Sequence, residues 1–562
     1  MTDMIYDAII VGSGITGGWA AKELTEGGMK VLMIERGRPI AHMTDYTTEH
    51  KPIYEFPFRM MGDRRTIEKQ YDVQRQCPLF DEASSHFFAR DDENPYAVDD
   101  GSRFAWIRGH QLGGRSLTWG RQSYRMASLN FEENLIDGHG VDWPIRYPDL
   151  APWYAHVEKF IGVAGEPIHN AMSPDGIYQP PFPMNVAEED LRARFARHWP
   201  DRPVTMARTA MLTQAIGDSR QPCHYCGPCE RGCSAGAYFS TQSSTLPAAQ
   251  ATGRLTVLTD SIVSRISVDE EKMRATGVTV VDAVTRQESR YSGRCVFLCA
   301  SALESVRLLL LSATDRQPAG LANSSGMVGK FIMDHHFSDV AMTTVPAQSL
   351  GNFTGARSVP LHIPRFQNIG AQRKDYRRGY QLNAGAALTN WTRGMTMKGI
   401  GRDFKAELGK TPEWRLILIA QCEGLPSISN RVELDTKLRD KWGIPALRMN
   451  VRWTDNDLAM RKDAGDTCVE MMKTAGYSNV TRIPSDPAPG VAIHEMGGAV
   501  MGRDPKTSVL DAHNRCHDIP NLFVTDGAAM SSSSSANPSL TYMAMTARAA
   551  TFAVREWKAG RL

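Results

Sequence analysis

The amino-acid sequence predicts an α/β fold in which a Rossmann-like domain is joined to a second domain built on a mixed β-sheet with helices. Three observations support this prediction. Residues 5–35 form a complete strand–helix–strand pattern, residues 254–300 alternate with the period of two typical of strands, and residues 521–557 contain a strand, a serine-rich loop and a helix. Because these segments lie far apart in the chain, we expect the first domain to be discontinuous.

The strand–helix–strand unit at the start of the chain is the most informative segment. An apolar run at 5–11 predicts a buried strand, 19–25 predicts a helix, and 30–34 predicts a second strand that Glu35 closes. A glycine-rich run at 12–18 separates the first strand from the helix. This order of elements is typical of a nucleotide-binding β-α-β unit.

Three glycines in that run follow the pattern G-x-G-x-x-G. Gly12 permits a tight turn, Gly14 lets backbone amides approach a pyrophosphate, and Gly17 allows close packing of strand and helix. Glu35 lies 18 residues beyond Gly17, where a carboxylate can accept hydrogen bonds from ribose hydroxyls. The set predicts a dinucleotide site, and a glycine-rich turn without a ligand is the alternative.

The remaining elements follow in chain order. Residues 38–105 show no sustained period, so we expect an irregular excursion over the surface. The other expectations are a glycine-rich segment at 108–121, a helix at 149–162, a meander at 254–300, a helix at 301–312, short strands within 336–489, a strand at 521–527 and a helix at 539–557.

The glycine pattern alone does not separate NAD from FAD. An NAD-binding domain is usually completed within a contiguous half-sheet. Here a second glycine cluster occurs at 112–120 and a third at 524–527. Segments that return from distant parts of the chain suit a long, permanently held dinucleotide, and we therefore expect FAD.

Composition and charge exclude several other classes of protein. The chain has 562 residues, with 64 Lys+Arg against 62 Asp+Glu, a net charge of +2. This balance argues against nucleic acid as the main partner. The longest aliphatic run, 308–311, is far shorter than the roughly 20 residues that span a bilayer. The first residues show no signal-peptide pattern, so we expect a cytoplasmic protein, or a periplasmic one exported with a partner.

Taken together, these segments resemble the glucose–methanol–choline (GMC) flavoprotein oxidoreductases over nearly the whole chain. The resemblance is carried by the Gly12–Gly17 motif with Glu35, by LGGRSLTWG at 112–120, by Val263, by NSSGMVGKFIMDHH at 323–336, and by His494 paired with Asn537. Within the family the sequence is most similar to the catalytic subunits of glucoside 3-dehydrogenase, gluconate dehydrogenase and FAD glucose dehydrogenase.

The resemblance implies an FAD site spread over the chain. One group of family members carries a histidine before the tryptophan of the second glycine segment and binds flavin covalently through it; Thr118 occupies that position here, so we expect noncovalent FAD. The implied cofactor-binding residues are Gly12, Gly14, Ile15, Thr16, Gly17, Glu35, Arg36, Arg108, Gly113, Gly114, Ser116, Thr118, Trp119, Gly120, Val263, Ala300, Asp526, Gly527, Asn537, Pro538 and Ser539.

The chemistry of alcohol oxidation assigns roles to two residues of this resemblance. The flavin takes a hydride, and the hydroxyl proton needs a base with a pKa near the working pH. We expect His494 to be that base and Asn537 to hydrogen-bond the alcohol oxygen; a structural histidine and a turn asparagine before Pro538 are the alternatives. The adjacent His335 and His336 lack metal-ligand spacing, so we expect a structural role for both.

Four of the ten cysteines form a compact cluster. Cys223, Cys226, Cys229 and Cys233 follow the pattern C-x2-C-x2-C-x3-C, a spacing used for iron–sulfur ligation. Zinc, and a disulfide or free thiols, are the other interpretations. In FAD glucose dehydrogenases a related segment with three cysteines holds a [3Fe–4S] cluster; Cys226 is extra to that pattern. The functional interpretation is electron exit from flavin to a cytochrome.

These expectations combine into a two-domain enzyme. We expect the FAD-binding domain to comprise 1–37, 106–125, 236–335 and 490–562. The substrate domain comprises 38–105, 126–235 with the cysteine loop 223–233, and 336–489.

The predicted reaction is oxidation of a secondary alcohol of a sugar or glycoside, with the 3-hydroxyl as the candidate position and with a small subunit and a cytochrome as candidate partners. The rivals are an oxidase of the same fold that uses O2, acting on glycosides or other alcohols, and a flavin electron-transfer subunit without its own substrate.

Overall fold

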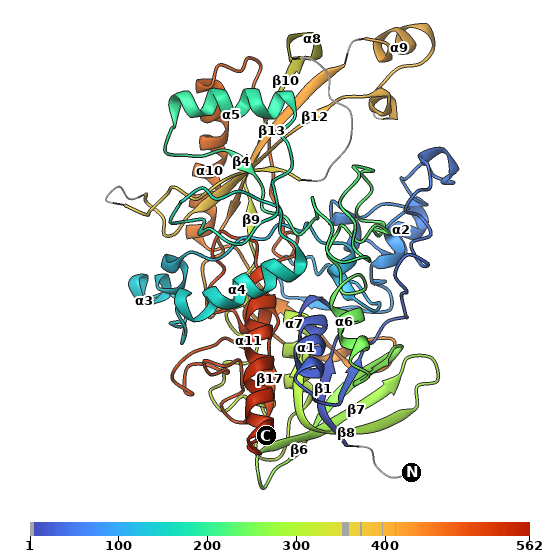
Figure 1. Ribbon diagram of the computed structural model, residues 1–562, viewed down its shortest axis with the longest axis vertical. Coiled ribbons are helices and arrows are strands. Elements are labelled where there is room, and N and C mark those ends of the chain that lie inside the picture. The colour runs from blue at the N-terminus through green and yellow to red at the C-terminus, as the bar shows by residue number, and fades with distance from the viewer. Residues whose placement is uncertain (1–4, 351–358, 371–373, 396, 411) are drawn as a thin grey trace.

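A computed structural model describes residues 5–350, 359–370, 374–395, 397–410 and 412–562. Figure 1 shows two lobes: one carries β1, β6, β7 and β8 with α1 and α11, and the other carries β10, β12 and β13 with α5 and α10. The helices are α1 Ile15–Glu26, α2 Arg64–Gln70, α3 Glu133–Asp137, α4 Tyr147–Ile161, α5 Val186–His198, α6 Thr245–Ala251, α7 Ala302–Leu311, α8 Ala347–Leu350, α9 Gly401–Leu408, α10 Asp455–Thr474 and α11 Ser539–Lys558.

The first sheet combines distant segments of the chain in the order β5-β2-β1-β8-β7-β6. Its strands are β1 Ile5–Val11, β2 Val31–Ile34, β5 Leu255–Leu258, β6 Ser261–Asp269, β7 Arg274–Asp282, β8 Glu288–Leu298 and β17 Leu522–Val524. The ladders of β1 with β2 and β8 are parallel, while β6, β7 and β8 form an antiparallel meander. The C-terminal β17 pairs in parallel with the end of β8.

Alternate residues of this sheet pack on opposite faces. Ala8, Ile10 and Phe523 share a buried cluster with side chains of α1 and α11. Ile9, Val524 and their neighbours on the other face share a second cluster with α7. Because both faces are covered by helices, the central strands are apolar throughout rather than alternating with polar residues.

The second lobe is built around an antiparallel sheet with the order β16-β10-β13-β12-β11-β4 and with β9 beside β13. The strands are β4 Thr205–Met206, β9 His336–Phe337, β10 Val340–Pro346, β11 Leu361–Ile363, β12 Tyr380–Leu388, β13 Glu413–Cys422 and β16 Thr481–Ile483. The chain leaves the first lobe at residue 335. The short β9 follows and pairs with the end of β13, with His336 opposite Cys422. This pairing brings the centre of the second sheet up to the first lobe.

A hairpin of β14 Arg431–Arg439 and β15 Pro445–Asn450, with β3 Ala97–Val98 at its edge, forms a third small sheet. Its apolar residues Val432 and Leu447 belong to the same cluster as α7. The hairpin therefore packs on the first lobe, although residues on both sides of it in sequence build the second lobe.

The α/β fold class predicted from the sequence is confirmed, and most expected elements are present close to their expected bounds. The sheet of the second lobe has antiparallel ladders throughout its described residues. The mixed sheets are the first one and the small third one, in which β15 pairs with β14 antiparallel and with β3 in parallel. Helix α1 begins at Ile15, four residues before the expected start at residue 19, because Gly17 and Gly18 lie inside the helix. Among the described residues, no helix combines the length and apolarity needed to cross a bilayer.

Candidate active site

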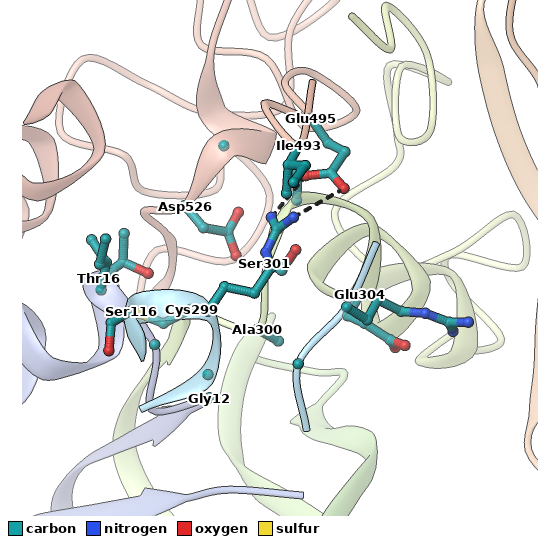
Figure 2. Close-up of a pocket in the computed structure, with 18 of the residues that line it drawn as sticks. Gly12, Thr16, Ser116, Cys299, Ala300, Ser301, Glu304, Ile493, Glu495 and Asp526 are labelled. Carbon is teal, nitrogen blue, oxygen red and sulfur yellow. Dashed lines mark hydrogen bonds and ion pairs between the residues drawn. The ribbon is translucent and has the colours of Figure 1, made fainter. Parts of the chain in front are cut away.

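A deep cleft opens where β1, β2 and β8 end and the second lobe begins. It encloses about 1780 Å³ of space between atoms, its mouth included. Its lining residues come from segments far apart in the chain, from Val11 near the start to Tyr542 near the end. Figure 2 shows Gly12, Thr16, Ser116, Cys299 and Ala300 gathered at one part of its wall.

Most of the residues expected to bind cofactor or to act in catalysis line this single cleft. Gly17 and Gly113 are the exceptions and lie behind its wall. The expected residues that line it are Gly12, Gly14, Ile15, Thr16, Glu35, Arg36, Arg108, Gly114, Ser116, Thr118, Trp119, Gly120, Val263, Ala300, His494, Asp526, Gly527, Asn537, Pro538 and Ser539.

The glycines in the turn after β1 serve two different purposes, close packing of the chain and open space in the cleft. A Cβ on Gly12 would lie 2.5 Å from the Cys299 carbonyl oxygen, and one on Gly17 would lie 2.0 Å from the Gly12 carbonyl oxygen. Both positions therefore need glycine for the chain to pack. A Cβ on Gly14 would meet nothing within 4 Å, because it would project into the cleft. Only Gly14 keeps space open for a ligand.

Glu35 connects this turn to the second glycine segment. Its Oε2 accepts hydrogen bonds from Ser13 N at 3.2 Å and Ser13 Oγ at 2.6 Å, and its Oε1 accepts from Gly37 N at 2.9 Å. Gly113 N in turn donates to Ser13 Oγ at 2.8 Å. Burial raises the pKa of Glu35. The Glu35–Ser13–Gly113 contacts place both glycine segments on the same side of the cleft.

At the end of the cleft away from His494, the buried Arg108 side chain has a nitrogen that lacks a hydrogen-bond acceptor within the described residues. Arg108 Nη2 donates to the Asn94 carbonyl at 2.6 Å, but within the described residues its Nε has no hydrogen-bond acceptor. Desolvation lowers the pKa of Arg108 to about 10. A buried guanidinium nitrogen without an acceptor is costly, so a ligand oxygen or nitrogen in the cleft would satisfy it.

These features fit the FAD that the sequence resemblance implies. The open position at Gly14 and the N-terminus of α1 suit a pyrophosphate. Glu35 suits a ribose, and Val263 beside the cleft suits the adenine. Thr118 lies in the wall, and its side chain offers no ring nitrogen for a bond to flavin.

At the other end of the cleft, His494 is held by its backbone. Its N–H donates to Asp334 Oδ1 at 3.0 Å, and Gly490 N donates to Asp334 Oδ2 at 2.7 Å. Burial raises the pKa of Asp334 to about 8. Ile493, directly before the histidine, has a φ of +65°, a left-handed conformation that bulky residues rarely adopt. The two bonds to Asp334 hold this turn and present the His494 ring to the cleft.

The His494 ring contacts two side chains. Its Nε2 lies 3.4 Å from Asn537 Nδ2, and its Nδ1 lies 2.9 Å from His335 Nδ1. Desolvation lowers the pKa of His494 well below its ordinary value, and the neighbouring His335 and Arg115 lower it further. The ring is therefore neutral near pH 7 and can accept a proton.

Two glutamines from the second lobe hold the Asn537 amide. Gln381 Nε2 and Gln421 Nε2 lie 3.2 Å and 3.3 Å from Asn537 Oδ1. They are register partners on β12 and β13. Neither glutamine could be found from the sequence, because a polar residue in a buried strand carries no motif. His335, for which the sequence predicts a structural role, contacts the His494 ring.

The rest of this end is set by α11 and a buried ion pair. Asn537, Pro538 and Ser539 line the cleft at the N-terminus of the 20-residue helix α11. Arg115 donates to Glu495 Oε2 at 2.8 Å. The positive end of the helix dipole favours negative charge at this part of the cleft.

The cysteine cluster does not form a metal site among the described residues. Cys223, Cys229 and Cys233 are partly buried and Cys226 is exposed, and all ten cysteines of the chain are free thiols. No group of three or more His, Cys, Asp or Glu side chains in the described part of the chain is arranged to hold a metal ion. The geometry thus supports neither an iron–sulfur cluster nor zinc, and no step is assigned to the cluster.

Comparison with known proteins shows the family to which the chain belongs. Models of the GMC oxidoreductase family match residues 6–337 and 426–546. The chain belongs to the GMC oxidoreductase family. The matched segments contain Gly12, Glu35 and His335 on one side and His494 and Asn537 on the other, so both ends of the cleft lie within the family match.

Relatives of this GMC oxidoreductase include dehydrogenases and oxidases. It is 28% identical to the fructose dehydrogenase large subunit of Gluconobacter japonicus, over 99% of this chain and 98% of the relative. It is 27% identical to paromamine 6'-oxidase of Streptomyces fradiae, over 98% and 91%. Among solved structures, formate oxidase shares the fold with a TM-score of 0.64 at 15% identity, over the full length of both chains.

The two glycines of the first turn give a matched pair of variants. For Gly17→Ala we expect the free energy of unfolding of the flavin-free protein to fall by about 1–3 kcal/mol, because the new methyl overlaps the Gly12 carbonyl. For Gly14→Ala we expect unchanged stability but weaker FAD binding, because its methyl enters the cleft. Denaturant unfolding and FAD titration check both; equal stability losses in the two variants would contradict the assignment.

The depressed pKa of His494 predicts the acid side of the pH profile. The base must be neutral, and burial lowers its pKa below the ordinary 6.5. We therefore expect kcat/KM to stay level through neutral pH and to fall only as the pH drops through a value below about 6.5. Steady-state rates across pH measure this limb, and a midpoint above pH 7 would exclude a buried neutral His494 as the base.

Proposed function

We propose that this GMC oxidoreductase uses noncovalent FAD to oxidise a secondary alcohol of a sugar or glycoside to a ketone, with His494 as the base. The observation that carries the proposal is the His494–Asn537 pair, 3.4 Å apart, at one end of a cleft whose other end fits a dinucleotide. A base and a hydrogen-bond donor that share one small volume are suited to a single hydroxyl group.

Oxidation removes two hydrogens from the substrate: a proton from the hydroxyl group, which His494 accepts, and a hydride from the carbon. The alcohol oxygen would lie beside the pair, within hydrogen-bond reach of both nitrogens, and would replace Asn537 Nδ2 as the partner of the His494 Nε2 lone pair. Its O–H bond breaks and the proton forms a bond to Nε2. When bound, FAD accepts the hydride from the carbon that carries this oxygen. The products are the ketone, protonated His494 and the reduced cofactor.

The surrounding groups stabilise the negative charge that develops on the alcohol oxygen. Asn537 Nδ2 can donate to the oxygen as it becomes negative, since Gln381 and Gln421 already occupy Asn537 Oδ1. The N-terminus of α11 adds a positive potential beside it. Both groups are in place before reaction, so they need little reorganisation as charge develops.

The substrate class is supported by the relatives rather than by the pocket alone. The fructose dehydrogenase large subunit is named for a sugar, and the gluconate 2-dehydrogenase flavoprotein of Pantoea cypripedii, 27% identical, for a sugar acid. We place the reacting hydroxyl at position 3 on the resemblance to glucoside 3-dehydrogenases. Because a relative is a large subunit, we also propose a small subunit and a cytochrome as partners that remove electrons.

The proposal is tested by mixing the flavin-loaded enzyme anaerobically with free sugars, glycosides and simple alcohols. We expect the oxidised flavin absorbance to bleach with sugars or glycosides, and His494→Ala to keep its flavin while bleaching roughly 10²–10⁴-fold more slowly. His50→Ala, at a side chain that is 63% exposed, is the matched control and should bleach at the wild-type rate.

Two results of that experiment would contradict the proposal. If no sugar, glycoside or alcohol bleaches the wild-type flavin, the chain is an electron-transfer subunit without substrate chemistry of its own. If His494→Ala bleaches at the wild-type rate, another group is the base.

The second candidate function is an oxidase, which the resemblance to paromamine 6'-oxidase favours. The two activities differ only in the electron acceptor. For the dehydrogenase we expect turnover with an artificial electron acceptor and little hydrogen peroxide in air-saturated buffer. Peroxide formed in a one-to-one ratio with ketone, at a rate equal to that with the artificial acceptor, would establish the oxidase instead.

A further inference from the structure

The catalytic pair belongs to a longer chain of hydrogen bonds that begins and ends on the buried serine tract 531–535. We propose that His335 and Gln421 are positioning residues that hold His494 in the tautomer with its proton on Nδ1, so that Nε2 carries the lone pair. The carbonyl groups of Ser534 and Ser535 fix the direction of every bond in this chain. The inference rests on the proposed function in one respect, that His494 is the base.

The Ser534 carbonyl determines which nitrogen of His335 carries the proton. The carbonyl oxygen lies 2.7 Å from His335 Nε2 and can only accept, so Nε2 carries a proton. Burial lowers the pKa of His335 to about 4, which keeps the ring neutral and leaves Nδ1 as an acceptor. His494 Nδ1, 2.9 Å away, must then be the donor. A neutral His494 with a proton on Nδ1 has its lone pair on Nε2.

The Ser535 carbonyl independently determines the orientation of the Gln421 and Asn537 amides. The carbonyl oxygen accepts from Gln421 Nε2 at 2.9 Å, which identifies that atom as the amide nitrogen. Gln421 Nε2 also lies 3.3 Å from Asn537, so the Asn537 atom there is the oxygen. Asn537 Nδ2 then faces His494 and can only donate, and His494 Nε2 must accept. Both ends of the chain assign the same tautomer.

The opposite tautomer conflicts with its neighbours at two places. With its proton on Nε2, His494 would direct a donor at the Asn537 NH₂ group and a lone pair at the lone pair of His335. It would also have no lone pair facing the cleft to take a proton. Unpaired donors and acceptors in a buried site are costly, so this state is disfavoured.

The serine tract that sets these directions is itself firmly held. The hydroxyls of Ser531, Ser532 and Ser533 donate to the carbonyls of residues 501, 130 and 424 at 2.7, 3.1 and 2.9 Å. Ser534 has a φ of +55°, a turn that separates the carbonyl directions of residues 534 and 535. These contacts give a role to the serine run, which the sequence shows only as a low-complexity loop.

The charged side chains near the His494 ring form their hydrogen bonds with other groups. Arg115 donates to Glu495, and Asp334 accepts from the backbone N–H groups of residues 490 and 494. Neither Arg115 nor Asp334 hydrogen-bonds a ring nitrogen of His494. The tautomer therefore depends on the neutral chain through His335 and Gln421.

Three variants test the role of His335. His335→Leu removes the acceptor, and we expect kcat to fall by about 10²-fold with KM changed less than about threefold and FAD retained. His335→Asn keeps an oxygen near the Nδ1 position, and we expect it to recover at least about tenfold of that loss. His336→Gln is the control: the neighbouring ring bonds the Glu423 carbonyl and lies outside the chain, so wild-type kcat is expected.

A direct measurement keeps the proposal testable even if a variant fails to fold. In protein labelled with ¹⁵N-histidine, protonated and unprotonated ring nitrogens resonate in separate regions, and His494→Ala identifies the relevant signals. We expect the wild-type spectrum to show His494 with a protonated Nδ1 and an unprotonated Nε2. In Gln421→Glu, which replaces the donor with an acceptor, we expect loss of this single tautomer and a shifted acid limb of kcat/KM.

A wild-type spectrum with the proton on His494 Nε2 would overturn the proposal, and so would His335→Leu with wild-type kcat. These outcomes are separable from failure of the proposed function. If no sugar or alcohol reduces the flavin, the function is wrong, but the tautomer is still read from the spectrum.

Discussion

The contact between His494 and Asn537 is the interaction on which the rest of the structure depends. His494 belongs to the turn that Asp334 holds, whereas Asn537 lies at the start of α11. The two residues are 43 positions apart in sequence and meet only because β17 inserts beside β8 and so directs α11 back to the cleft. A donor and an acceptor 3.4 Å apart can both reach one hydroxyl group placed beside them, which is the physical basis of the proposed chemistry.

The two lobes contribute unequal parts to that contact. The first lobe supplies both members of the pair and the turn that suits a dinucleotide. The second lobe supplies Gln381 and Gln421 from neighbouring strands, and these set the orientation of the Asn537 amide. The short β9, which begins directly after His335, links the lobes at this place. The active site is therefore sensitive to how the lobes pack, although its reactive atoms lie on one of them.

The sequence predicted the parts of the site that follow local rules. The turn at Gly12–Gly17, the acid at Glu35 and the meander at 254–300 depend on neighbours in the chain, and the structure contains all three. His494 and Asn537 were chosen by chemistry and family resemblance. Gln381 and Gln421 could not be predicted, since their role arises from the register of two strands distant from Asn537. The iron–sulfur cluster predicted from the cysteine spacing has no support among the described residues, because that spacing alone does not set the geometry in which four thiols face one ion.

We propose that one substrate hydroxyl lies beside His494 Nε2 and Asn537 Nδ2, within reach of both, and next to the bound cofactor. The most direct measurement is a crystal structure of the FAD-loaded enzyme with a sugar analogue that it cannot oxidise. The account predicts a hydroxyl oxygen within about 2.6–3.2 Å of both nitrogens, with its carbon facing the flavin ring. A sugar bound elsewhere in the cleft, or a His494 ring that turns Nδ1 toward the hydroxyl, would contradict it.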